Sequence, residues 1–177
     1  MAAAWPAAAQ TIDPVDGRMR WHVGPTDGLA NQYVRQSSRS SICEFAVWDK
    51  SGFFAEAVFC ETLSGWYWKQ SYMTLDLAMD EFGHLADFMT RGPEPFRDLN
   101  SNIGQVDLYG FTIDDPDNAG LWQCLVFIKG FNREDRGYQQ MLMAYMCDDT
   151  GEGLSENRLS EALAGLSIDE VFSQFVD

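Results

Sequence analysis

The stretch 121–147 constrains the fold of this chain more than any other, because it has the pattern of one long β-hairpin with a cysteine near each end. Apolar residues dominate both arms, and the polar run 132–137 between them has the composition of a turn. Counting outward from the turn places Cys124 opposite Tyr145, with Cys147 two residues further along the same face. Such diagonal neighbours come within reach of a disulfide after a modest adjustment. The hairpin therefore predicts a bridge between Cys124 and Cys147.

Residues 42–61 form a second hairpin candidate around the turn 49–52, where Gly suits a left-handed loop position. The same counting places Cys43 opposite Val58, with Cys60 again two residues along the same face. A second disulfide between Cys43 and Cys60 is therefore predicted. Each hairpin is followed by a helical pattern, so this parallel also indicates an internal duplication, although the residues of the two parts do not align well.

The four cysteines contain no Cys-x-x-Cys pair, and a tetrahedral zinc site usually draws its ligands from such close pairs. Zinc is therefore the less favoured explanation. An even number of cysteines in two hairpin-spanning pairs favours disulfides and an oxidising compartment, either periplasmic or extracellular. The alternative is four buried free thiols in a cytosolic protein, since cysteine is among the most buried residue types.

The composition predicts one acidic domain. The chain has 177 residues, of which 46% are hydrophobic and 14% aromatic, enough to bury one core. Its 27 acidic residues outnumber the 12 Lys and Arg, giving a formal charge of −15, and this sign disfavours nucleic acid and anionic membranes as partners. Residues 1–43 hold four Arg and three Asp, whereas residues 44–177 hold eight basic and 24 acidic residues. A partner with a basic surface would therefore meet the later part.

Residues 1–12 stand apart from the rest in composition. The start has the small-residue Ala-x-Ala character of the end of a secretory signal, without the charged and apolar regions that precede it. We interpret residues 1–12 as a signal-peptide remnant or, alternatively, as a disordered Ala-rich tail, and residues 13–177 as a single domain. No segment reaches the roughly 20 apolar residues that a membrane helix needs, so no membrane span is expected.

The periodicity of the remaining segments predicts an α+β fold. We expect a mainly antiparallel sheet of five to seven strands with two or three packed helices. The predicted elements are strands at 18–23 and 105–113, a helical turn near 29–34, a helix over 75–90 capped by Thr74, a polar connection at 94–104, and helices beginning at Ser155 and Ser167.

Catalytic signatures are scarce in this sequence. Its two histidines, His22 and His84, do not supply a multi-histidine metal site, and a hydrolytic triad would have to use one of them. The motif Glu81-Phe-Gly-His84 places two ligands on one helix face, but a carboxylate-bridged di-iron site needs the motif twice, so an exposed pair is predicted. The glycines of 151–153 lie in the order of a dinucleotide loop, yet the acidic residues around them would repel a pyrophosphate. No catalytic, cofactor or metal residue is therefore predicted.

Carboxylates are crowded in one turn of the chain. Asp114, Asp115 and Asp117, with Asn118, resemble calcium ligands, but an apolar residue occupies the closing position of the EF-hand pattern. These residue types also favour turns without any metal. We therefore expect calcium binding to be weak or absent.

The aromatic run Trp66-Tyr67-Trp68 is the best candidate for an interaction surface. In a strand, Trp66 and Trp68 would share one face and Tyr67 would lie on the other, which leaves one side available to a protein or a ring-shaped ligand. The alternative is that these aromatics close one end of the core.

Two classes of function remain open on the sequence. The first is an exported, acidic, non-catalytic protein that binds another protein, such as an accessory subunit, an inhibitor or an immunity-type partner. The second is a carboxylate-based enzyme or a protein that binds a small ligand or calcium. Acidity, predicted disulfides, the aromatic run and the missing catalytic signatures favour the first, although fold class alone does not separate the two.

Overall fold

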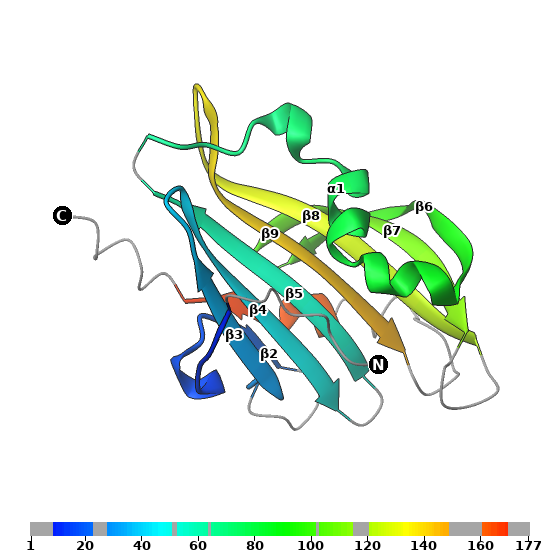
Figure 1. Cartoon of the computed structure of the whole chain (residues 1–177). Coiled ribbons are helices and arrows are strands. Elements are labelled where there is room, and N and C mark those ends of the chain that lie inside the picture. The colour runs from blue at the N-terminus through cyan, green and yellow to red at the C-terminus, as the bar shows by residue number, and fades with distance from the viewer. Residues whose placement is uncertain are drawn as a thin grey trace.

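The computed structural model describes residues 9–22, 28–50, 53–63, 65–101, 103–114, 121–148 and 161–169. These residues form one eight-stranded antiparallel sheet and a second sheet of two strands (Figure 1). The strands are β1 (Gln10–Thr11), β2 (Met19–Trp21), β3 (Gln32–Ser37), β4 (Ser41–Lys50), β5 (Phe53–Thr62), β6 (Met89–Ser101), β7 (Gly104–Asp114), β8 (Leu121–Glu134), β9 (Gly137–Asp148) and β10 (Leu166–Ile168). The helical elements are η1 (Pro14–Asp16), η2 (Gln70–Tyr72), α1 (Leu75–Glu81) and η3 (Gly83–Phe88), with a further helical turn at 161–164.

The strand order of the large sheet is symmetric about its centre. The order is β1-β3-β4-β5-β9-β8-β7-β6, so that the meander β3-β4-β5 meets the meander β9-β8-β7 through the antiparallel pair β5 and β9. Ala57 faces Ala144 at this junction. A two-fold rotation through that pair exchanges the two meanders and exchanges the two disulfides. The backbone thus has the symmetry that an internal duplication predicts, whereas the side chains differ: Glu44 follows the first cysteine of one hairpin and Leu125 follows that of the other.

Both predicted disulfides are present. Cys43 is bonded to Cys60 and Cys124 to Cys147, with Cα atoms 4.1 Å apart in each pair. The predicted register was wrong by two residues in both hairpins, because each cysteine lies directly opposite its partner rather than diagonally. The strands continue further toward the turns than their composition indicates, and β8 extends through Asn132 to Glu134.

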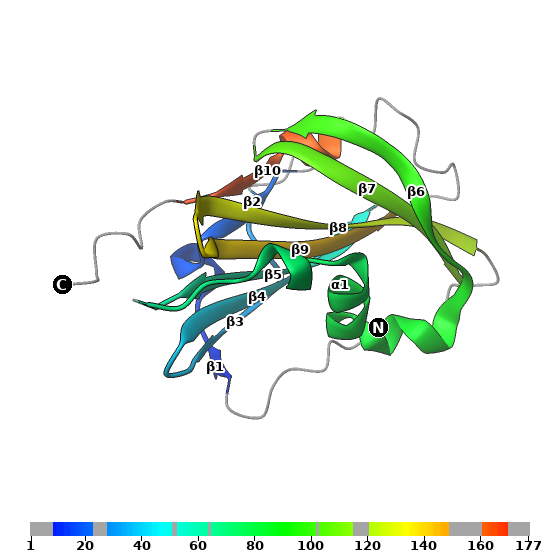
Figure 2. The ribbon, with the colours of Figure 1, turned by 90° about the horizontal axis from the view of Figure 1, so that it is seen from above.

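Both faces of the large sheet are buried, so its central strands are apolar runs rather than alternating patterns. One face packs against the small sheet β2–β10 and the turn at 161–164, through residues such as Trp21, Trp48 and Leu163. The other face packs against α1 and η3, through Ala78 and Phe82. Figure 2 shows these two covers on opposite sides of the sheet.

The strand β7 buries one face along its first half and the other along its second half. Val106 and Leu108 belong to the core under the small sheet, whereas Phe111 and Ile113 belong to the core under α1 and η3. Because successive side chains of a strand alternate between faces, the even-numbered pair and the odd-numbered pair point to opposite sides of the sheet without any break in the strand. The strand β7 therefore contributes side chains to both cores.

The predicted α+β class was wrong, because the described chain is mostly antiparallel sheet with short helical elements. The helix expected over 75–90 ends at Glu81, is followed by the separate 3-10 helix η3, and gives way to β6. The polar connection expected at 94–104 lies largely within β6, and the helical turn expected near 29–34 gives way to β3 from Gln32. For β3 and β6, pairing with a neighbouring strand outweighed the local pattern.

The ends of the chain differ from the prediction as well. The helix expected to begin at Ser167 is replaced there by β10, which pairs with β2. The start of the helix expected from Ser155 lies outside the described residues. So do residues 1–8, whereas Gln10 and Thr11 pair with β3. Over the described part of the chain, no helix has the length and apolar character to cross a bilayer.

Candidate functional site

The chain leaves the sheet after β5 and returns to it at Trp68. Glu61 pairs with Gln140 on β9, and the next backbone pairing with that strand is an isolated bridge between Trp68 and Tyr138. The bridge consists of two backbone hydrogen bonds of 2.8 Å, donated by Trp68 N and by Tyr138 N. The aromatic run therefore lies beside the tip of the β8–β9 hairpin, where Figure 1 shows the two segments crossing.

Gly137 makes this bridge geometrically feasible. Its φ of +140° lies in a region that other residues rarely adopt, and a Cβ atom added there would come within 2.3 Å of the carbonyl oxygen of Trp68. The backbone of the aromatic run approaches the hairpin at a position where only hydrogen fits. The absence of a side chain at Gly137 therefore allows the backbone of Trp68 to pair with the hairpin.

Replacement of Gly137 by Ala is expected to lower the free energy of unfolding by about 1–3 kcal/mol, because it adds backbone strain and a clash with Trp68. Denaturant unfolding measures the loss, and hydrogen exchange of the Trp68 amide should accelerate. The control is Gly92→Ala, since a Cβ at Gly92 meets no atom within 4 Å and should change stability by less than about 0.5 kcal/mol. Equal effects of the two substitutions would contradict this role of Gly137.

A hydrogen-bonded recess lies between the aromatic run and the hairpin tip. The hydroxyl of Tyr67 donates to Glu134 Oε2 at 2.8 Å, and Gln139 Nε2 donates to Glu134 Oε1 at 2.7 Å. The hydrogen bond to Glu134 raises the pKa of Tyr67 above its usual value. The guanidinium of Arg136 lies 6.0 Å from the centre of the Tyr67 ring. An open recess of about 470 Å³ is lined by Tyr67, Glu134, Asp135 and Arg136.

The three aromatics of the run differ in their surroundings. The side chain of Trp66 is 60% exposed, whereas Tyr67 and Trp68 are both partly buried, and Trp68 packs against the core under α1 and η3. A fourth aromatic, Tyr72 on η2, is also 60% exposed. The sequence reasoning missed Tyr72, because no pattern around it distinguishes an exposed tyrosine from a buried one. We call Trp66, Tyr67, Tyr72 and the tip residues 134–136 the tip surface.

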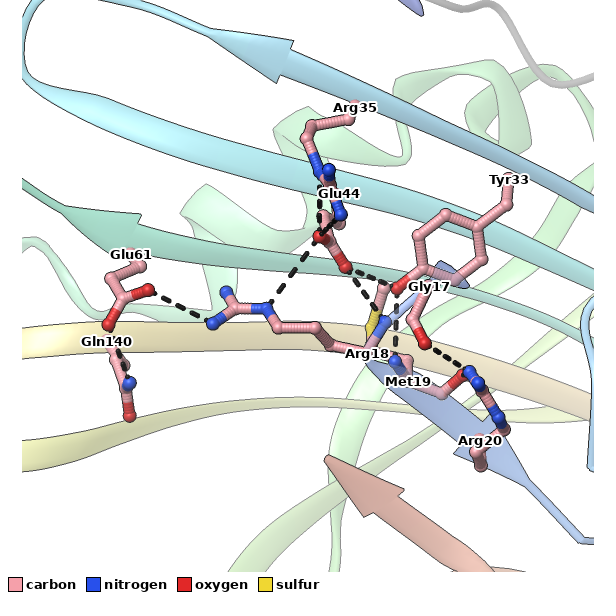
Figure 3. A network of polar contacts seen from close by, with 9 residues as sticks. All are labelled: Gly17, Arg18, Met19, Arg20, Tyr33, Arg35, Glu44, Glu61 and Gln140. Carbon is pink, nitrogen blue, oxygen red and sulfur yellow. Dashed lines mark hydrogen bonds and ion pairs between the residues drawn. The ribbon is translucent and has the colours of Figure 1, made fainter. Parts of the chain in front are cut away.

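A second polar cluster lies inside the protein and centres on Glu44, which is fully buried (Figure 3). Arg35 donates to Glu44 Oε1 through Nε at 2.9 Å and Nη2 at 2.7 Å. The hydroxyl of Tyr33 and the backbone N–H of Arg18 donate to Glu44 Oε2 at 2.6 and 3.1 Å. The Tyr33 hydroxyl in turn accepts from the backbone N–H of Met19. Burial, and then the charge of Glu44, raise the pKa of Tyr33 far above its usual range.

The side chain of Arg18 extends this cluster across the sheet. Its guanidinium lies 4.4 Å from the centre of the Phe59 ring and donates to Glu61 Oε2 at 3.0 Å. Gln140 donates to the other oxygen of Glu61. The cluster therefore contains two arginines and two glutamates, and it connects β2 with β3, β4, β5 and β9. Its groups bond one another, which indicates a structural role in attaching the small sheet.

The third polar cluster attaches η3 to the opposite face of the sheet. His84 Nε2 lies 3.3 Å from Glu56 Oε2, and Glu56 is buried. Glu56 faces Tyr145 across the strands β5 and β9. Burial, and then the negative charge of Glu56, raise the pKa of Tyr145 well above its usual value. The prediction of an exposed Glu81 and His84 pair was wrong for His84, which turns inward.

The remaining candidate sites, the acidic stretch after β7 and the recess between β6 and β7, show fewer groups suited to binding or catalysis among the described residues. Asp114 is exposed at the end of β7, and the calcium candidates Asp115, Asp117 and Asn118 lie outside the described residues. Within the described ranges, no three His, Cys, Asp or Glu side chains gather as metal ligands. A recess of about 250 Å³ lies where the register of β6 shifts against β7, with the exposed ion pair of Arg91 and Glu94 at its rim.

Comparison of the chain with protein-family models, with curated proteins and with solved structures found no match. Two intramolecular disulfides are compatible with an oxidising compartment.

Proposed function

We propose that this chain is an exported, acidic, non-catalytic protein that binds another protein through the tip surface. The observation that carries the proposal is the exposure of Trp66 and Tyr72, each at 60%, on a segment braced by backbone hydrogen bonds to the hairpin. Large aromatics held in place dominate binding energy at protein interfaces, because they bury much area and lose little conformational entropy. Trp68 supports the segment from beneath rather than meeting the partner.

Two further properties support this proposal. Disulfides in hairpins suit a periplasmic or extracellular location, where they persist. The net charge of −15 would attract a partner with a basic surface and raise the rate of association. The buried clusters around Glu44 and Glu56 connect elements of the fold, whereas at the tip surface polar and aromatic side chains face solvent together.

Replacement of Trp66 by Ala is expected to weaken partner binding by about 2 kcal/mol, mainly through faster dissociation. The measurement is affinity capture of the tagged protein from its own source, followed by mass spectrometry and surface-based kinetics with each captured protein. The matched control is Leu121→Ala, because Leu121 is 59% exposed and lies at the start of β8, away from the hairpin tip. Both variants should remain folded.

The expected partner is captured by the wild type and by Leu121→Ala, and is depleted with Trp66→Ala. Raising the salt concentration from about 0.05 to 0.5 M should cut its association rate, because the Debye length falls from about 14 Å to about 4 Å. A partner that binds both variants equally, at a rate indifferent to salt, would place the interface elsewhere.

A further inference from the structure

Among the described residues, the two carboxylates of the tip surface, Glu134 and Asp135, take part in no ion pair. Both donors to Glu134, the Tyr67 hydroxyl and the Gln139 amide, are neutral. They orient the carboxylate and leave its charge in place, and each oxygen still has a free lone pair. The carboxylate of Glu134 is therefore oriented in advance for a further donor.

Among the described residues that line the recess, Arg136 is the cation, and it faces a ring rather than a carboxylate. Its guanidinium lies 6.0 Å from the Tyr67 ring centre, at the outer limit of a cation–π contact. Two carboxylates and one guanidinium leave a net charge of −1 at the recess. The recess thus combines an aromatic wall, an oriented carboxylate and a negative balance, which are the features that receive a cationic side chain.

We propose that the recess formed by Tyr67, Glu134, Asp135 and Arg136 receives an arginine or lysine side chain of a protein partner, while Trp66 and Tyr72 cover apolar groups beside it. This inference rests on the proposed function and specifies the partner chemistry at the same surface. The basic side chain donates to Glu134, and the charge of Asp135 stabilises it further. The negative charge of the whole protein steers such a partner toward this site.

The test uses short peptides as probes of the full-length protein. An acetylated and amidated tetrapeptide, Gly-Arg-Leu-Gly, is compared with the same peptide carrying citrulline in place of arginine, which keeps the shape and removes the charge. Backbone amide shifts in nuclear magnetic resonance spectra report where each peptide binds. We expect shifts confined to residues 66–72 and 134–136, with the arginine peptide binding at least about fivefold more tightly than the citrulline peptide.

Two double variants test whether the recess is responsible. Glu134→Gln with Asp135→Asn should abolish the preference for arginine over citrulline. Asp49→Asn with Asp87→Asn removes the same charge at exposed positions outside the recess and should preserve the preference. Equal binding of the two peptides, shifts elsewhere on the protein, or equal losses in the two double variants would overturn the proposal.

These outcomes also separate the inference from the proposed function. If the peptides show no preference while capture of a partner still depends on Trp66, the protein binds through the aromatics and the inferred role of the recess is wrong. If the preference is present and capture is independent of Trp66, the recess binds cations and the proposed interface is wrong.

Discussion

Replacement of Glu44 by Ala is expected to lower the free energy of unfolding by about 3–5 kcal/mol, the largest effect predicted for a single substitution in this chain. The carboxylate of Glu44 is fully buried and accepts from Arg35, Tyr33 and Arg18. Its removal takes away the carboxylate that lies 3.7 Å from Nε of Arg18, whose charged side chain is 3% exposed in the protein interior. Denaturant unfolding followed by circular dichroism measures the change.

The control for this substitution is Glu94→Ala. Glu94 pairs with Arg91, and both side chains are more than 60% exposed, so the loss of that ion pair should cost less than about 1 kcal/mol. If Glu44→Ala does not accumulate as a folded protein, Tyr33→Phe tests the same cluster through one hydroxyl, with an expected cost of about 1–3 kcal/mol. Losses no larger than that of Glu94→Ala would show that the cluster contributes little.

Removal of either disulfide is expected to cost about 3 kcal/mol, because the closed loops span 17 and 23 residues and restrict the unfolded chain to a similar degree. Replacement of Cys124 and Cys147 by Ala avoids placing a polar group in the core, where both sulfurs lie. The variant without Cys43 and Cys60 should lose a similar amount. Unfolding midpoints of the two variants, measured in parallel, test this equivalence.

Peptide mapping without reductant provides the control on connectivity. The wild-type protein should yield Cys43 joined to Cys60 and Cys124 joined to Cys147, and the double variants should each retain the remaining bridge. Cys43 joined to Cys124 would contradict the pairing, and four thiols that alkylate without reductant would contradict both the pairing and the oxidising compartment.

The hairpins and their disulfides could be predicted from the sequence because their evidence is local. Two apolar runs around a polar turn define a hairpin, and a cysteine near each end limits the pairing. The meander of β7, β8 and β9 follows from the same signals. The register was missed by two residues because turn composition does not show where a strand ends: Asn132, with a φ of 51°, still belongs to β8.

The secondary structure of several other segments depended on their neighbours. Residues 89–101 have a polar, proline-containing sequence that resembles a connection, yet they form β6 because β7 offers a free edge. The C-terminal Leu166–Ile168 resembles the start of a helix, yet it pairs with β2. Backbone pairing with a distant strand satisfies hydrogen bonds that a local pattern cannot anticipate.

For the tip surface and the polar clusters, too, some features could be predicted from neighbouring residues, whereas others depend on contacts between distant parts of the chain. The sequence identified Trp66, Tyr67 and Trp68 as candidates, since an aromatic run is visible in one window of residues. It could not separate the exposed Trp66 from the half-buried Trp68, because that difference arises from the bridge to Tyr138, 70 residues further along the chain. Glu44 accepts from Tyr33 and Arg35 on the adjacent strand β3. It meets Arg18 only when the small sheet packs on the large one, and Glu56 meets His84 only when η3 packs on β5. Periodicity and cysteine spacing act over a few residues and therefore predict hairpins, whereas burial of a charge depends on which distant groups surround it.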